Sequence, residues 1–387
     1  MTLPELSREE VRRYGRHLIL PQVGPQGQRR LKAARVLMVG AGGLGSPIGL
    51  YLAAAGIGSL GVVEFDRVDE TNLQRQVLYG QGDVGRDKLV AAGERLQEVN
   101  PHLNLEAHGL RLESQQALDL IADYDIVVDG SDNFATRYLV NDACVLTGKP
   151  NVFGAVLKFE GQAAVFWGER GPCYRCLFPE PPPPGLVPSC AEGGVFGVLP
   201  GIIGSIQATE VIKLVLGEGE PLLGRLLTLD ALTMRFREVR IPKNPGCPVC
   251  GDEPTITELM DYDLHCGTEA AGEGDETMDE GLLDEIEVET LQAWLQAGRQ
   301  LHLLDVRNPV EYQICRLDGA ELLPLAELPG RWQGLDRDTL TVVYCHGGVR
   351  SAQAVDFLRR QGLSRVVNLA GGIDAWSRRI DPTVPRY

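Results

Sequence analysis

The cysteines of this chain fall into groups whose spacing suits two different kinds of sulfur chemistry. Cys345 opens the glycine-rich segment Cys-His-Gly-Gly-Val-Arg-Ser, in which four residues separate it from Arg350. Backbone N–H groups converge in a loop of this kind and favour a negatively charged sulfur. We therefore expect Cys345 to be a nucleophile or a persulfide carrier. A cysteine that only packs in the core would need neither the glycines nor the arginine.

Four further cysteines form two C-x-x-C pairs that lie far apart in the sequence. The pairs are Cys173 with Cys176 and Cys247 with Cys250. Together they supply the four thiolates of a closed tetrahedral site, the arrangement of structural Zn2+. A redox dithiol needs one pair and not two, so we prefer zinc over a dithiol and over ordinary buried thiols.

A glycine-rich loop between a predicted strand at 35–39 and a predicted helix indicates a nucleotide site. Its glycines are Gly40, Gly42, Gly43 and Gly45. Such glycines let the backbone approach phosphates, which then meet the helix N-terminus. Glu64, 19 residues beyond Gly45, could accept hydrogen bonds from ribose hydroxyls. Taken alone, the loop also fits a dehydrogenase or a purely structural turn.

Polar residues after this loop favour a nucleoside triphosphate over NAD. In chain order they are Asn72, Arg75, Lys88, Asp132 and Asn133. Cations and amides stabilise a pyrophosphate leaving group, whereas a hydride transfer needs no such charge stabilisation. Asp132 follows the predicted strand 124–129, at the carboxyl edge of the sheet, where ligands bind and Mg2+ could be held. Each residue alone could be a solvated surface group, but the ordered set favours a site.

The set as a whole, over about residues 5 to 265, resembles the MoeB/ThiF group. The likeness rests on Gly-Ala-Gly-Gly-Leu-Gly, Glu-Phe-Asp, Asn-Leu-Gln-Arg-Gln, Ser-Asp-Asn and the two C-x-x-C pairs. These relatives of ubiquitin-activating enzymes adenylate the C-terminal glycine of ubiquitin-like sulfur carriers. The resemblance implies ATP contacts at Gly43, Glu64, Asn72, Arg75, Lys88 and Asp132. Many relatives have Asp-x-Asp at the ribose strand, so both Glu64 and Asp66 are candidate ribose ligands here.

Two further roles follow from the same resemblance. Arg16 is expected to reach the nucleotide of the partner subunit in a homodimer. Cys190 follows the proline-rich stretch 181–188. In the related enzymes a cysteine on this crossover loop attacks the activated acyl group, and a packed thiol is the alternative for Cys190.

The segment from about 288 to 387 resembles a single rhodanese domain. Leu-Leu-Asp-Val-Arg at 303–307 and Gly-Gly-Ile-Asp-Ala-Trp at 371–376 carry the likeness. The loop after Cys345 is one residue shorter than in the similar phosphatase fold, which suits a sulfur atom better than phosphate. The resemblance implies a persulfide on Cys345, supplied by thiosulfate or by a cysteine desulfurase. Asp305 and Arg307 are expected to form a structural pair near the loop.

Strands that alternate with helices predict an α/β fold with a doubly wound, Rossmann-like sheet. We expect an adenylation domain with the zinc site at 1–266, an acidic flexible linker at 267–287, and a smaller α/β rhodanese domain at 288–387. Of the 53 acidic residues, 15 lie between 244 and 298, where there is no lysine or arginine, so the net charge of −16 belongs largely to this region. No basic cluster suggests nucleic acid. The most apolar stretch, 195–206, is too short for a membrane helix, which indicates a soluble protein. The paired C-x-x-C spacing and the lack of a recognisable signal peptide favour a reducing, cytoplasmic setting.

The predicted activity couples two reactions. ATP and Mg2+ would activate the Gly-Gly terminus of a ubiquitin-like sulfur carrier as an acyl-adenylate, and sulfur from Cys345 would convert it to a thiocarboxylate. The alternatives are an NAD-dependent oxidoreductase fused to a rhodanese domain and a non-catalytic binding scaffold. The intact set Arg75, Lys88, Asp132 and Cys345 argues against a scaffold.

Overall fold

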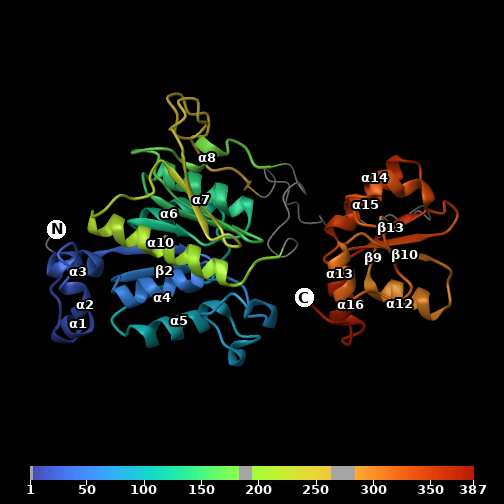
Figure 1. The fold of residues 1–387 in the computed structure, drawn as a ribbon, viewed down its shortest axis with the longest axis horizontal. Coiled ribbons are helices and arrows are strands. Elements are labelled where there is room, and N and C mark those ends of the chain that lie inside the picture. The colour runs from blue at the N-terminus through green and yellow to red at the C-terminus, as the bar shows by residue number, and fades with distance from the viewer. Residues whose placement is uncertain (1–2, 183–193, 263–283) are drawn as a thin grey trace. The chain divides into compact units, whose positions relative to one another are not determined.

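The computed structural model describes residues 3–182, 194–262 and 284–387, which belong to two compact units (Figure 1). The first unit is Met1–Ala271 and the second is Gly272–Tyr387. Each unit contains its own sheet and its own buried apolar clusters. The α/β fold class predicted from the sequence is confirmed in both units.

An eight-stranded sheet in the order β3-β2-β1-β4-β5-β6-β7-β8 forms the centre of the first unit. Strands β1 to β5 pair in parallel, and β6, β7 and β8 continue the sheet antiparallel. The strands are β1 Arg35–Val39, β2 Ser59–Val63, β3 Asn104–His108, β4 Ile126–Asp129, β5 Asn151–Leu157, β6 Glu160–Phe166, β7 Arg225–Asp230 and β8 Arg235–Arg240. The chain reverses its direction of winding between β1 and β4, which is where such sheets bind ligands.

Helices cover both faces of this sheet (Figure 1). On one face pack α3 (Gly24–Ala33), α4 (Gly45–Ala55), α5 (Lys88–Val99) and α10 (Val198–Leu216), and on the other α6 (Ser114–Ala122) and α7 (Phe134–Leu146). Shorter helices are α1 (Arg8–Arg13), α2 (Gly15–Leu18), α8 (Tyr174–Leu177), and the 3-10 helices Glu70–Asn72 and Gln81–Asp83. The central strand β1 is an apolar run because helices bury both of its faces.

Helix α10 is longer than the apolar stretch noted in the sequence. With 19 residues it is long and apolar enough, by length and composition alone, to cross a membrane. Its side chains Leu199, Ile203 and Val211 are completely buried, and the helix packs against α4, β5 and β6. Burial on several elements accounts for the apolar composition of α10, which is a core helix of the first unit.

The second unit has a five-stranded parallel sheet in the order β11-β10-β12-β13-β9. Its strands are β9 Glu285–Ile286, β10 His302–Asp305, β11 Glu321–Leu322, β12 Thr341–Tyr344 and β13 Val366–Leu369. Helices α12 (Val288–Gln296), α13 (Pro309–Ile314), α14 (Leu328–Arg331), α15 (Val349–Arg360), α16 (Gly372–Arg379) and the 3-10 helix Trp332–Gly334 surround it. The central strand β12 leads directly into Cys345.

Strand β9 corrects the predicted linker boundary. Its residues lie within 267–287, yet they pair with β13, and Ile286 is 4% exposed in the core of the second unit. The acidic residues on either side of Ile286 gave this stretch the composition of the predicted acidic linker. A single buried side chain was too weak a signal to reveal the strand.

Candidate functional site

A cavity of about 240 Å³ lies at the carboxyl edge of the first sheet, at the reversal between β1 and β4. Residues from the ends of β1, β2 and β4 line it together with the start of α5. Among them are Gly40, Gly42, Gly43, Glu64, Asp66, Arg75, Lys88, Asp132 and Asn133. The structure therefore brings most of the predicted nucleotide residues to one place.

The glycine loop has a shape that side chains would prevent. Gly40 has φ +88°, in the left-handed region. A Cβ on Gly45 would lie 2.1 Å from the carbonyl oxygen of Gly40. Gly45 is the first residue of α4 and does not line the cavity, so its role is to let the helix start close against the loop.

Glu64 and Asp66 occupy different environments. The carboxylate of Glu64 accepts hydrogen bonds from the backbone N–H groups of Ala41 at 3.0 Å and of Phe65 and Asp66 at 2.9 Å. Asp66 is more exposed, and its carboxylate lies 3.2 Å from Nζ of Lys88. Glu64 thus fixes the glycine loop to the end of β2, while Asp66 and Lys88 form an ion pair at the cavity.

Two other predicted residues do not line this cavity. Asn72 accepts a hydrogen bond from the Asp69 backbone at 3.3 Å and so caps a 3-10 turn. Arg16 lies on α2 with an exposed side chain, away from the described residues that form the cavity wall. Within a single chain, the structure does not bring Arg16 to the site.

The turn after β4 is shaped by a buried carboxyl group. Asp129 is completely buried, and its Oδ1 accepts hydrogen bonds from N–H and Oγ of Ser131 at 2.9 and 2.6 Å. Burial raises the pKa of Asp129. The turn places Asp132 and Asn133 at the cavity, where Asn133 also caps α7 by accepting from the Thr136 backbone.

The four predicted metal ligands meet in space. All four sulfur atoms of Cys173, Cys176, Cys247 and Cys250 lie within 4.8 Å of one another. Two of the S–S distances are 3.5 Å and one is 4.0 Å. Tetrahedral zinc with Zn–S bonds of about 2.3 Å places its sulfurs about 3.8 Å apart. The cluster therefore has the dimensions to bind a metal such as zinc.

Hydrogen bonds within the cluster shift the pKa values of the thiols in opposite directions. The bond between Cys173 and Cys176 raises the pKa of Cys173 and lowers that of Cys176. The backbone N–H of Asn244 adds a donor 3.4 Å from the Cys176 sulfur. A divalent cation would let all four thiols ionise, because its charge offsets the repulsion between thiolates at these distances.

Arg175, between the cysteines of the first pair, connects the cluster to neighbouring elements. Its guanidinium is 1% exposed and binds both carboxylate oxygens of Asp142 on α7. Tyr262 donates to the same carboxylate at 2.7 Å. Nη1 of Arg175 donates to the carbonyl of Pro179 at 2.8 Å. Arg175, which lies between Cys173 and Cys176, thus fixes α8 against α7, the helix that begins at the cavity.

In the second unit, Cys345 is 1% exposed at the end of β12. Its sulfur accepts from the Gly348 backbone at 3.1 Å and from Oγ of Ser351 at 3.3 Å. Gly348 has φ +96° and immediately precedes α15. The loop therefore places one backbone donor, from Gly348, and one hydroxyl donor, from Ser351, on the sulfur.

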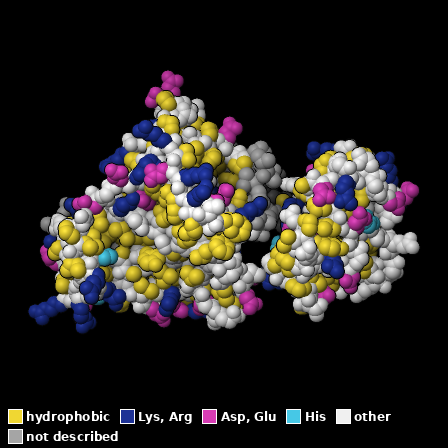
Figure 2. All heavy atoms as spheres, viewed as in Figure 1, with side chains coloured by type: hydrophobic (Ala, Val, Ile, Leu, Met, Phe, Trp, Pro, Cys, Tyr) yellow, Lys and Arg dark blue, Asp and Glu magenta, His cyan; other side chains and the backbone are white. Residues whose placement is uncertain are grey.

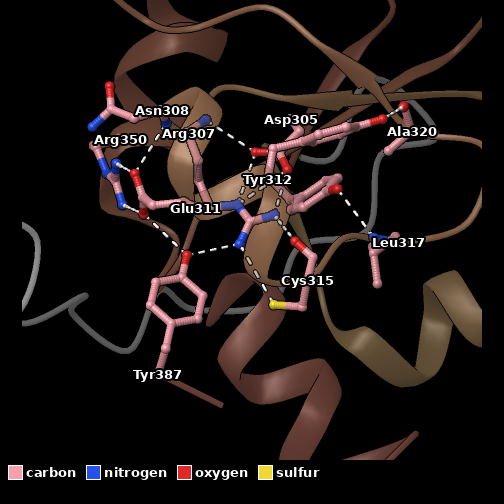
Figure 3. A network of polar contacts seen from close by, with 11 residues as sticks. Asp305, Arg307, Asn308, Glu311, Tyr312, Cys315, Leu317, Ala320, Arg350 and Tyr387 are labelled. Atoms are coloured by element: carbon pink, nitrogen blue, oxygen red, sulfur yellow. Dashed lines mark hydrogen bonds and ion pairs between the residues drawn. The ribbon is translucent and has the colours of Figure 1, made fainter. Parts of the chain in front are cut away.

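Arg350 pairs with a carboxylate from a different helix (Figure 3). Its two terminal nitrogens each lie 2.8 Å from an oxygen of Glu311 on α13. Burial alone would raise the pKa of Glu311, but the hydrogen bonds from Arg350 and the Asn308 backbone hold it below its usual value. The predicted structural pair of Asp305 and Arg307 is confirmed, and both side chains are completely buried.

Comparisons with known proteins agree with this geometry. Residues 14–249 match the model of the ThiF family, and residues 287–379 match that of the rhodanese-like domain. The chain belongs to the ThiF family. The two matches confirm the MoeB/ThiF and rhodanese resemblances found in the sequence.

Curated relatives cover the whole chain or about two thirds of it, and their names include adenylyltransferase and sulfurtransferase. The probable adenylyltransferase/sulfurtransferase MoeZ of Mycobacterium tuberculosis is 51% identical, and the match covers 99% of this chain and 96% of MoeZ. The sulfur carrier protein adenylyltransferase of Thermus thermophilus is 60% identical over 67% of this chain and 98% of its own length. Adenylyltransferase and sulfurtransferase MOCS3 of Anopheles gambiae is 43% identical, and the match covers 100% of this chain and 90% of MOCS3.

Solved structures resemble the first unit at lower identity. The crystal structure of E. coli MccB with ATP has a TM-score of 0.52 and 25% identity, covering 58% of this chain and 68% of that one. E. coli MccB with MccA-N7isoASN has a TM-score of 0.56 and 24% identity, covering 64% and 76%. These likenesses agree with the ThiF fold.

Two further arginines, Arg111 and Arg137, line the cavity. Neither was predicted from the sequence. The guanidinium of Arg137 lies 5.5 Å from the ring centre of Phe153 and 3.4 Å from the Ser131 carbonyl. Arg137 is one helical turn after Asn133, and this spacing could have revealed it. Cys190 and Cys266 lie outside the described residues, whereas Cys144 and Cys315 are buried thiols.

Proposed function

We propose that this chain adenylates the C-terminal glycine of a ubiquitin-like sulfur carrier and then transfers sulfur to it from Cys345. The observation that carries the proposal is the cavity at the sheet reversal, which gathers Arg75, Lys88 and Asp132 around a glycine loop. The same chain holds a cysteine with donors aimed at its sulfur. Relatives named for both activities support the pairing.

In the first reaction, a carboxylate oxygen of the carrier attacks the α-phosphorus of ATP, and the bond to pyrophosphate breaks. The glycine loop receives the phosphates at the start of α4. Arg75 and Lys88 stabilise the negative charge that develops on the leaving pyrophosphate. Asp132 would hold Mg2+, which supplies further positive charge at the phosphates. Between the two candidate ribose ligands, Glu64 already binds three backbone donors, so Asp66 has more freedom to contact the hydroxyls.

In the second reaction, the outer sulfur of a Cys345 persulfide attacks the acyl carbon, and the bond to AMP breaks. The product is an acyl disulfide with Cys345. A thiol must then attack the Cys345 sulfur to release the thiocarboxylate, leaving a disulfide between that thiol and Cys345. We assign this thiol to Cys190, which lies outside the described residues. The sulfur donor is thiosulfate or the persulfide of a cysteine desulfurase.

We also propose a structural Zn2+ in the cysteine cluster and a homodimer in which Arg16 reaches the nucleotide of its partner. The S–S distances support zinc. Hydrophobic side chains gather over α4 and α10 (Figure 2). The side chain of Tyr51 on α4 is 58% exposed. This apolar area supports an interface between copies. The free thiols of the described cysteines suit a reducing compartment, so we place the protein in the cytoplasm.

The deciding experiment incubates candidate Gly-Gly carriers with the protein, ATP, Mg2+ and thiosulfate. We expect carrier-dependent exchange between ATP and pyrophosphate. Mass spectrometry should then show one oxygen of the carrier replaced by sulfur. Binding of NAD without any such exchange would support the oxidoreductase alternative, and absence of both would support a scaffold. Metal analysis of protein purified without chelator should give one zinc per chain.

A further inference from the structure

The side chain of Tyr387 touches two ion pairs of the second unit (Figure 3). Its hydroxyl oxygen accepts a hydrogen bond from Nη1 of Arg307 at 2.7 Å, and the hydroxyl donates to Oε1 of Glu311 at 3.0 Å. Arg307 belongs to the buried pair with Asp305, and Glu311 belongs to the pair with Arg350. One phenol oxygen thus joins a core ion pair to the ion pair of the active-site loop.

The chemistry of these groups sets the direction of the two hydrogen bonds. Arg307 has only donors to offer, and ionised Glu311 has only acceptors, so a neutral phenol is the group that satisfies both. Burial raises the pKa of Tyr387 and keeps the phenol protonated. The order of donation is therefore from Arg307 to Tyr387 to Glu311.

The ring of Tyr387 makes a separate contact with the loop. Its centre lies 4.6 Å from that of the His346 ring, with an angle of 50° between the ring planes. His346 directly follows Cys345. Residue 387 therefore contacts the loop at its start through the ring and near its end through Glu311 and Arg350.

We propose that Tyr387 is a positioning residue for sulfur transfer at Cys345, acting through Glu311 on Arg350. Arg350 is adjacent to Ser351, whose hydroxyl donates to the Cys345 sulfur. The guanidinium of Arg350 is the positive charge of the loop that follows Cys345. Glu311 can hold that guanidinium in one orientation only if the carboxylate itself is fixed. The Tyr387 hydroxyl and the Asn308 backbone fix it. The inference rests on the proposed sulfurtransferase function.

The test removes one oxygen atom from the protein with both units present. Tyr387→Phe keeps the ring on His346 and deletes the hydroxyl. We expect the KM for thiosulfate to rise about tenfold, since one hydrogen bond to a charged group is lost, while kcat changes less. Tyr312→Phe is the matched control, because its hydroxyl donates to the Ala320 carbonyl outside this chain of contacts. The control should keep a KM near that of the wild type.

A double-mutant cycle separates positioning from a general loss of stability. If Tyr387 acts through Glu311, Tyr387→Phe should change KM very little in a Glu311→Gln background. Two independent effects that multiply, or a drop in kcat at constant KM, would overturn the proposal. Should Tyr387→Phe fail to fold, Glu311→Asp tests the same link with the phenol intact. An unchanged KM in Glu311→Asp would then reject it.

The activity of the wild type distinguishes a failure of the Tyr387 proposal from a failure of the proposed sulfurtransferase function. A wild-type chain that transfers no sulfur from thiosulfate or from a desulfurase persulfide contradicts the proposed function, and the inference falls with it. An active wild type with an unaltered Tyr387→Phe variant contradicts the positioning role alone.

Discussion

The buried charge of Arg175 should contribute strongly to the free energy of unfolding of the first unit. Its guanidinium and the Asp142 carboxylate are both almost completely buried. Arg175→Ala leaves Asp142 without its cation in the interior, so we expect the free energy of unfolding to fall by about 3–5 kcal/mol. Urea denaturation of the full chain measures this change. Arg170→Ala is the control, since Arg170 is exposed over the ring of Trp167. Equal small effects in both variants would contradict the assignment.

The active-site loop should make the second unit sensitive to acid in two steps. Burial lowers the pKa of His346 below its usual 6.5, so the imidazole in the folded protein resists protonation. The unfolded chain takes up this proton more readily than the folded protein. The free energy of unfolding is therefore highest above pH 6.5 and falls as the pH drops toward the pKa of His346 in the folded protein. Glu311, whose pKa is also lowered, adds a second loss below pH 4.5. Calorimetric melting from pH 7 to 4 should show both.

His346→Gln provides the control for the first step. It should flatten the dependence of the melting temperature between pH 7 and 5 and leave the loss below pH 4.5 in place. A wild-type melting temperature that is constant from pH 7 to 5 would show that His346 does not carry this effect.

Individual residues could be predicted from the sequence when their partners are close along the chain. Asp305 and Arg307 are two positions apart, and their pairing was expected. Tyr387 lies 80 residues from Arg307, and no local pattern marks it as a partner. Glu64 was expected to bind ribose, but its backbone donors become visible only when the strand end and the glycine loop meet in space.

At the scale of elements, the start of α4 depends on a close approach of backbone to backbone. A Cβ on Gly45 would overlap the Gly40 carbonyl, so Gly45→Ala must displace the loop from the helix. We expect ATP affinity to fall at least about tenfold, because the phosphates lose a loop shaped by the helix N-terminus. Isothermal titration calorimetry measures this affinity. Gly82→Ala is the matched control, since a Cβ at Gly82 meets nothing within 4 Å. Similar affinities for both variants would contradict the argument.

Elements with a strong local signal were predicted well. The strand predicted at 35–39 coincides with β1, and the strand predicted at 124–129 contains β4. The antiparallel extension β6 to β8 was not foreseen, since β8 exposes every residue and has no buried face to give it a pattern. Tertiary pairing, rather than local preference, places such an edge strand.

At the scale of the whole molecule, the dimer proposal predicts a recovery of activity on mixing. Arg16→Ala and Asp132→Ala should each abolish pyrophosphate exchange. Mixed dimers of the two variants contain one site with both residues intact, so part of the activity should return. Exchange assays on heterodimers verified by two different affinity tags measure it. No recovery would reject the shared site.

The two units should also be chemically separable. Cys345→Ala should keep carrier-dependent pyrophosphate exchange, because the nucleotide cavity is built from first-unit residues alone. The same variant should lose thiosulfate sulfurtransferase activity and thiocarboxylate formation. Exchange assays and mass spectrometry follow the two reactions. Collapse of adenylation in a folded Cys345→Ala protein, with Cys144→Ala as a control at a buried thiol, would show that the reactions depend on each other.

The short strand β9 also has a mechanical consequence. A pull on the chain that precedes residue 284 enters the second unit at this edge strand, which pairs with β13 through only two residues. Such a load would peel β9 away before it could strain the rest of the sheet. The strand that ends at Cys345, β12, is held between β10 and β13. Tension on the chain before residue 284 would therefore be released two strands away from Cys345.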